Sequence, residues 1–382
     1  WNKCMRKLIL PLAILGTVGL VSAADIEIHG DINLDYGSYF DKDFDPKNAA
    51  NQDIDLSVKA ILDENVSVVV KANSRSNYRT GDGKLEESDI RHGFARSAAM
   101  GDSEQRFTGF DFDGAQLRWD VYNNVSLIFG DMTYSAGTFN HYFWRDPSRY
   151  AVIVREQSLR GIGAEFGTEK YGYGKAYLGA SDNNDHTVAA FATYALPLIN
   201  RPNENLILTP SVDWVFGSNI SRPNTYVLGT EVDYSKSMDL MNVGVYAVWG
   251  LHPYKNKGTH SFLVEPSFNY DFFNMSATFF YAITNSNYAA EPQLFTDDQL
   301  LVAVEPSFNL HKKFTVGVSY EFHNHDVDID NDSFHFLGAN FYLYPTLKTE
   351  AVFWAGYNFS DKDNGPFVDK RLAMGMSAKA SF

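Results

Sequence analysis

Residues 134–157, with the sequence YSAGTFNHYFWRDPSRYAVIVREQ, bring charged and aromatic side chains together in one segment. The charged residues are Arg145, Asp146, Arg149, Arg155 and Glu156, and the aromatic ones are Phe139, His141, Tyr142, Phe143, Trp144 and Tyr150. Stacking surfaces beside hydrogen-bonding charges suit sugars, and charges gathered at a narrow point set a preference among ions. The alternative interpretation is an ordinary solvated loop, and the choice depends on the elements that position this segment.

Two acidic runs could bind a divalent cation. Asp31-x-Asn33-x-Asp35 resembles the start of a calcium loop, but Tyr36 stands where that motif needs glycine and Lys42 where it needs glutamate. A strand face is therefore the better interpretation of this run. A second run, Asp326, Asp328, Asp330 and Asp332, fits a solvated loop, with divalent-ion binding as the alternative. No G-x-S-x-G, H-E-x-x-H or P-loop motif occurs, so we expect neither an enzyme nor a cofactor.

Composition and charge exclude several classes of protein. The chain has 382 residues, is 45% hydrophobic and 15% aromatic, and has a mean hydropathy of −0.27, unlike a helical membrane protein. Its formal net charge of −15 argues against nucleic acid as a partner. Cys4 is the only cysteine and precedes the apolar run described next, so we expect no disulfide or cysteine metal site in the exported protein.

Residues 1–23 have the pattern of a secretory signal peptide. An apolar run from Leu8 to Ala23 follows Arg6 and Lys7 and ends in small residues. We expect cleavage after Ala23, initiation at Met5, and residues 1–4 to be an upstream artefact. Residues 24–382 would then form one exported domain.

The segment VEPSFN occurs twice, at 264–269 and 304–309, and shows how the remaining chain is patterned. In each copy the apolar valine, proline and phenylalanine alternate with the polar glutamate, serine and asparagine. Alternation with a period of two predicts a strand with one apolar and one polar face. Because proline cannot donate to a β-ladder, we expect a bulge or bend at each copy.

Eighteen segments carry this alternation, and sixteen strands is the alternative count. They span roughly 26–39, 51–62, 66–78, 105–122, 125–133, 158–167, 174–182, 186–196, 205–217, 224–235, 239–251, 259–271, 274–284, 298–310, 313–323, 332–344, 346–358 and 369–382. Short connections such as 123–124 alternate with long ones such as 79–104 and 134–157. Segments this long suit strands tilted across a bilayer better than the short strands of a soluble sandwich. The sequence therefore predicts an all-β transmembrane antiparallel up-and-down β-barrel.

The aromatic residues fit the girdles found where such barrels meet the membrane surface. Candidates are Trp119, Trp249, Tyr270, Phe272, Phe273, Tyr342 and Tyr344. At its end, the chain alternates apolar residues at every second position back from Phe382.

Together, the signal peptide, the alternating strands and the terminal phenylalanine resemble Gram-negative outer-membrane porins. The resemblance covers the whole exported chain as architecture. It implies passive diffusion of small hydrophilic solutes and ions across the outer membrane, a homotrimer, and recognition of the strand ending at Phe382 by the barrel-assembly machinery.

The resemblance also implies that loop 134–157 folds into the lumen and forms a constriction. The expected constriction residues are Arg145, Asp146, Arg149 and Arg155 of the loop, and Lys71, Arg75, Arg118, Asp31 and Asp35 of the facing wall. The loop is less acidic than that family's pattern, which leaves the charge preference open. The alternative functions are a saccharide-selective channel, a structural or adhesive barrel that binds a surface polysaccharide, and a soluble carbohydrate-binding sandwich.

Overall fold

A computed structural model of the chain describes most of the segments that the sequence predicts as strands. It describes residues 25–40, 46–80, 111–140, 151–181, 188–216, 225–254, 257–283, 298–324, 327, 333–360 and 372–382. Within these ranges there is no helix long and apolar enough to cross a membrane.

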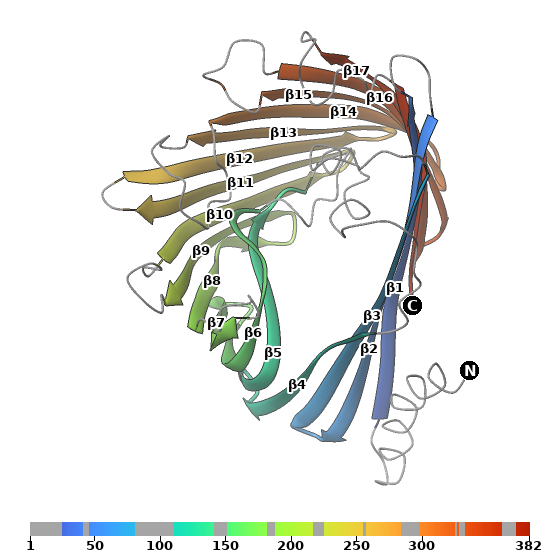
Figure 1. The fold of residues 1–382 in the computed structure, drawn as a ribbon. Coiled ribbons are helices and arrows are strands. Elements are labelled where there is room, and N and C mark those ends of the chain that lie inside the picture. Colours follow the sequence, from blue (N-terminus) through green and yellow to red (C-terminus); the bar gives the residue numbers. More distant parts are fainter. Residues whose placement is uncertain are drawn as a thin grey trace, which may run out of the picture.

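Eighteen β-strands account for nearly all of these residues (Figure 1). They are β1 (Asp25–Phe40), β2 (Pro46–Asp63), β3 (Val66–Thr80), β4 (Asp111–Tyr122), β5 (Val125–Thr138), β6 (Ala151–Thr168), β7 (Gly172–Ser181), β8 (Val188–Arg201), β9 (Glu204–Phe216), β10 (Thr225–Met238), β11 (Met241–Tyr254), β12 (Lys257–Tyr270), β13 (Phe273–Ile283), β14 (Gln299–His311), β15 (Phe314–Asn324), β16 (Ser333–Thr346), β17 (Thr349–Ser360) and β18 (Leu372–Ser381). The predicted count of eighteen is confirmed.

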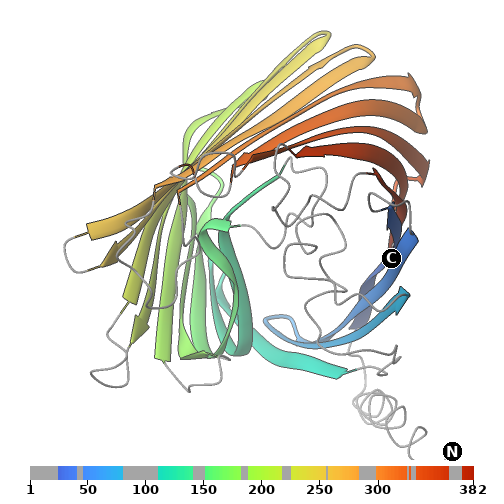
Figure 2. The same ribbon diagram turned by 45° about the horizontal axis from the view of Figure 1, so that its top comes forward.

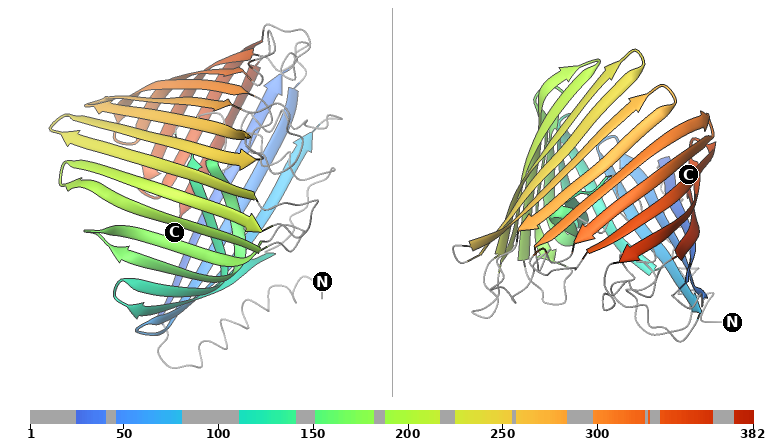
Figure 3. Two further views of the ribbon diagram at one scale, coloured as in Figure 1. Left: turned by 90° about the vertical axis from the view of Figure 1, so that its left-hand side faces the viewer. Right: turned by 90° about the horizontal axis from the view of Figure 1, so that it is seen from above.

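The sheet closes on itself. Each strand pairs antiparallel with its neighbours in sequence, and β1 pairs with both β2 and β18 (Figures 1 and 3). At the seam, Gly30 and Phe382 exchange two backbone hydrogen bonds of 3.1 and 3.0 Å. Closure removes the free strand edges that would otherwise leave backbone groups unpaired. The predicted up-and-down barrel is confirmed.

Alternate residues point to opposite faces of the wall, as β12 shows. Phe262 and Val264 are each 41% exposed, whereas their neighbours Leu263 and Glu265 are buried. Among the described residues, large exposed apolar side chains recur at outward positions of most of the strands. A continuous apolar outer face is the surface that a lipid bilayer covers.

Both VEPSFN copies have the predicted faces, but the predicted bulge is absent. The β12–β13 register is the same before and after Pro266, and the β14–β15 register is the same before and after Pro306. Instead, the proline and the glutamate before it are unpaired in the ladder on the side of the next strand, β13 for the first copy and β15 for the second. A proline can therefore stand in a strand with unbroken register, because it lacks the donor needed toward only one neighbour.

Two other expectations need correction. Tyr342, expected in an aromatic girdle, is on the inner face and donates a hydrogen bond to Glu305 at 2.7 Å. The segment expected to end at residue 133 continues as β5 to Thr138, and β6 begins at Ala151. Strand structure therefore extends into both flanks of the predicted loop 134–157.

Candidate functional site

The hairpin of β5 and β6 leaves the barrel wall partway along its length. β5 pairs with β4 only as far as Gly130, and β6 pairs with β7 only from Leu159, yet β5 and β6 pair with each other as far as Thr138 and Ala151. We call residues 131–140 and 151–158 the inner hairpin. Figure 2 shows it inside the barrel, turned away from β4.

Local backbone geometry explains where the hairpin departs. Gly114 and Gly130 have φ values of +138° and +115°, which residues with a Cβ rarely adopt. The backbone amide of Ala115 loses its strand partner there and instead donates to Asp131 Oδ2 at 2.9 Å. Arg160 Nε donates to the other oxygen, Asp131 Oδ1, at 2.6 Å. Asp131 thus replaces a missing ladder bond, which satisfies an otherwise orphaned donor.

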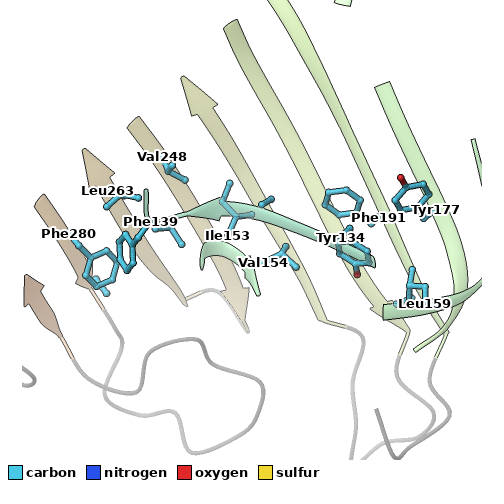
Figure 4. Packing of buried hydrophobic residues seen from close by; sticks show 14 of the residues in the cluster. Tyr134, Phe139, Ile153, Val154, Leu159, Tyr177, Phe191, Val248, Leu263 and Phe280 are labelled. Atoms are coloured by element: carbon cyan, nitrogen blue, oxygen red, sulfur yellow. The ribbon is translucent and has the colours of Figure 1, made fainter. Parts of the chain in front are cut away.

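Apolar packing holds the inner hairpin against the inside of the wall from β8 to β13 (Figure 4). The ring of Tyr134 stacks on Phe191 of β8 with centroids 4.1 Å apart. At the far end, Phe139 meets Phe280 of β13 edge to face, with centroids 5.1 Å apart. Between them, Ile153 is buried beside Gly229 of β10, and Val154 is buried in the same apolar cluster. The barrel therefore has a small apolar core on its inner side.

Two glycines of the wall let the hairpin backbone approach closely. A Cβ built on Gly229 would overlap the side chain of Ile153, and one on Gly250 would overlap the carbonyl oxygen of Val152. The same carbonyl accepts a hydrogen bond from Ser261 Oγ at 2.8 Å. Small residues on β10, β11 and β12 thus form the surface on which β6 lies.

Carboxylates of three wall strands accept hydrogen bonds from the hairpin. Tyr134 Oη donates to Asp213 Oδ1 at 2.6 Å, and the amide of Gly137 donates to Glu231. The amide of Asn140 donates to both oxygens of Glu265, at 3.0 and 2.8 Å. These contacts satisfy polar groups that the hairpin would otherwise bury unpaired.

β1 and β2 lie across the barrel from the inner hairpin (Figure 2). Their inner faces are polar and largely acidic. Asp31 lies directly opposite Asp55 in the ladder, and it also accepts a hydrogen bond from Ser381 of β18. Lys59 pairs with Glu27 at 3.0 Å. The inner hairpin therefore narrows the barrel from one side, and charged side chains line the other.

The residues expected at the constriction fall into three groups. Arg145, Asp146 and Arg149 lie outside the described residues, as do the side chains of Arg75 and Arg155. Asp31, Asp35 and Lys71 lie on the inner face of β1 and β3. Arg118 lies near the turn after β4, where it contacts Asp120 at 3.0 Å and Glu165 at 2.7 Å; no contact joins it to the inner hairpin among the described residues.

Sequence reasoning missed the wall residues that hold the hairpin: Asp213, Glu231, Glu265 and the apolar inner-face residues Val248, Leu263 and Phe280. A signal was present. The runs Phe262-Leu263-Val264 and Thr278-Phe279-Phe280-Tyr281 interrupt the alternation with apolar residues on both faces. A strand that is apolar on both faces is covered on both faces, which indicates something packed inside the barrel.

In the part of the chain that the structure describes, no three His, Cys, Asp or Glu side chains are grouped so that they could hold a metal ion. Asp31 and Asp35 lie on a strand face, as expected. The acidic run at Asp326, Asp328, Asp330 and Asp332 lies outside the described residues.

No protein-family model matches the chain, and no curated protein matches its sequence. Solved structures do resemble it. The outer membrane protein opdK from Pseudomonas aeruginosa has a TM-score of 0.59 and 10% identity over 93% of this chain and 99% of that one. OccAB4 from Acinetobacter baumannii has a TM-score of 0.58 and 9% identity over 95% and 99%.

OprD from Pseudomonas aeruginosa has a TM-score of 0.56 and 11% identity over 94% of this chain and 95% of that one. The likeness spans nearly the full length of each protein at very low sequence identity. The chain therefore has the fold of these proteins, of which opdK is an outer membrane protein.

Proposed function

We propose that the protein is a porin of a Gram-negative outer membrane, through which small hydrophilic solutes and ions diffuse passively. One observation carries the proposal: a closed barrel of eighteen strands is apolar outside, polar inside and narrowed by its own β5–β6 hairpin. Barrels of about 16–18 strands are wide enough to enclose an aqueous channel.

The constriction would form between the inner hairpin and the wall of β1 to β4. The loop residues Arg145, Asp146, Arg149 and Arg155 would face Asp31, Asp35, Lys71 and Arg75, and Arg118 would act nearer the turn end of the channel. Reversal potentials of an Arg145→Ala, Arg149→Ala double variant test this part. An unchanged value would remove both arginines from the constriction.

The proposed partners follow from the same architecture. Outer-membrane lipid would cover the apolar face, the strand ending at Phe382 would be recognised by the barrel-assembly machinery, and three copies would associate. The aromatic residues of 139–150 favour oligosaccharides as additional solutes, because aromatic faces stack on sugar rings.

Conductance in a planar bilayer tests the proposal. The purified, processed protein is expected to give discrete current steps, and competition with sugars would reduce the current if saccharides bind. A folded, heat-modifiable barrel that carries no current would instead indicate a plugged structural or adhesive barrel. A protein that stays soluble without detergent would contradict any membrane role.

A further inference from the structure

The two VEPSFN copies place two glutamates at equivalent positions of β12 and β14. Glu265 and Glu305 both point to the inner face, and they are 1% and 4% exposed. Each is followed by a proline that leaves the ladder unpaired toward the next strand. Two buried carboxylates in the same local sequence provide a comparison within a single chain.

Glu265 contacts the inner hairpin. Its two oxygens accept the backbone amide of Asn140, and Oε1 also accepts Thr278 Oγ1 at 3.0 Å from the facing position on β13. Asn140 follows Phe139, whose ring packs on Phe280. The carboxylate therefore holds the chain just past the end of β5, where Asn140 follows Phe139.

Glu305 contacts only wall residues in the contacts described for it. Its Oε2 accepts Asn340 Nδ2 at 2.7 Å, and its Oε1 accepts Tyr342 Oη at 2.7 Å; both partners belong to β16. The same motif thus supports the hairpin in one copy and the wall in the other.

We propose that Glu265 positions the end of the inner hairpin at Asn140 and so sets the aperture of the channel. The inference rests on the proposed function, because an aperture matters only if solutes pass. A backbone amide that donates to a buried carboxylate forms a charge-assisted hydrogen bond, stronger than one between neutral groups. Without that acceptor, the Asn140 amide has no partner on the wall side. The end of the inner hairpin is then expected to move off the wall and into the lumen.

The experiment compares matched variants: Glu265→Ala and Glu265→Gln with Glu305→Ala and Glu305→Gln. Each is reconstituted in planar bilayers, and single-channel conductance and the size limit for polyethylene glycol are measured. Heat-modifiable gel mobility checks that each barrel is closed. Glu265→Ala is expected to change conductance by about twofold and to shift the size limit, because current through a pore depends on its narrowest part.

Glu265→Gln keeps one acceptor oxygen and is expected to show a smaller change in the same direction. The two Glu305 variants are expected to keep the parental conductance and size limit while their barrels are closed. Equal changes in the Glu265 and Glu305 variants would overturn the proposal, because the effect would then come from the wall. Unchanged conductance in a folded Glu265→Ala barrel would also overturn it.

A second readout separates this inference from the proposed function. Trypsin cleavage at Arg145 or Arg149 reports movement of the segment beyond Asn140, whether or not the barrel conducts. Faster cleavage in Glu265→Ala than in Glu305→Ala supports positioning by Glu265. If the parental protein carries no current, the proposed function fails while the cleavage comparison still decides the role of Glu265.

Discussion

The ring of Phe382 lies over Gly30 on the outer face of the seam between β18 and β1. A Cβ built on Gly30 would overlap the Phe382 ring and approach the carbonyl oxygen of Asp55. The two residues also exchange both backbone hydrogen bonds. Phe382 therefore packs across the seam on a position where glycine is required by close contact rather than by backbone conformation.

Gly30→Ala is expected to destabilise the closed barrel by about 1–3 kcal/mol, because the added methyl forces the ring and the neighbouring strand to shift. Unfolding by urea in lipid vesicles measures the change. Phe382→Leu in the same chain should recover part of the loss, since the smaller side chain leaves room for the methyl. Equal destabilisation in the single and double variants would show that the ring does not matter.

Asp131→Ala is expected to destabilise the barrel by about 1–3 kcal/mol, because the Ala115 amide loses its only described acceptor where β5 leaves β4. Asp131→Asn keeps a side-chain oxygen for that amide and should cost less, although it weakens the contact with Arg160. The ranking is measured by thermal loss of the heat-modifiable form in detergent. Identical midpoints for the two variants would contradict this role of Asp131.

The barrel could be predicted from the sequence because each strand is recognised from the alternation of apolar and polar residues within its own segment. Alternation such as Val264, Pro266 and Phe268 against Glu265 and Ser267 needs no partner to be recognised, and all eighteen predicted segments are strands. The prolines led to the prediction of a bulge or bend, and no bulge is found. A strand has two neighbours, and the sequence does not show that only one of them needs the missing donor.

The site was harder to predict, because it depends on contacts between distant segments. Tyr134 alternates as a wall residue would, but its ring packs inside the barrel on Phe191 rather than toward lipid. The sequence pattern of an apolar side chain is the same whether lipid covers it outside the barrel or other side chains cover it inside. Likewise, Glu265 and Glu305 have identical neighbours in sequence, and only the fold brings Asn140 to one of them.

Gly229→Ala is expected to push Ile153 away from β10, because the added Cβ would overlap that side chain. The cost is about 1–3 kcal/mol from overpacking. Ile153→Ala alone should cost about 2–5 kcal/mol from the lost apolar contact. The double variant should be less destabilised than the sum of the single variants, since each change relieves the other's steric effect. Strict additivity in urea unfolding would mean that the hairpin does not contact Gly229 in the membrane.

The inner face of the barrel carries more acids than bases among the side chains that the structure describes. The acids that are neither buried nor in contact with the inner hairpin are Asp25, Glu27, Asp31, Asp35, Asp55, Asp120, Glu165, Asp233 and Glu350, and the bases are Lys59, Lys71, Arg118, Lys175 and Lys379. Three of the bases are already paired: Lys59 with Glu27, and Arg118 and Lys175 with Glu165. The surplus favours cations in the lumen, because charges lining a pore set its ion preference.

We therefore expect the reversal potential across a KCl gradient to have the sign of a cation-preferring channel. Asp31→Asn with Asp55→Asn should reduce the preference without changing side-chain size, since these two aspartates face each other on the inner wall. Glu204→Gln is the control, because Glu204 lies beside the turn after β8 and pairs with Arg201. Raising the salt concentration should weaken the preference by screening. A parental channel that prefers chloride would contradict control of ion passage by the acidic wall.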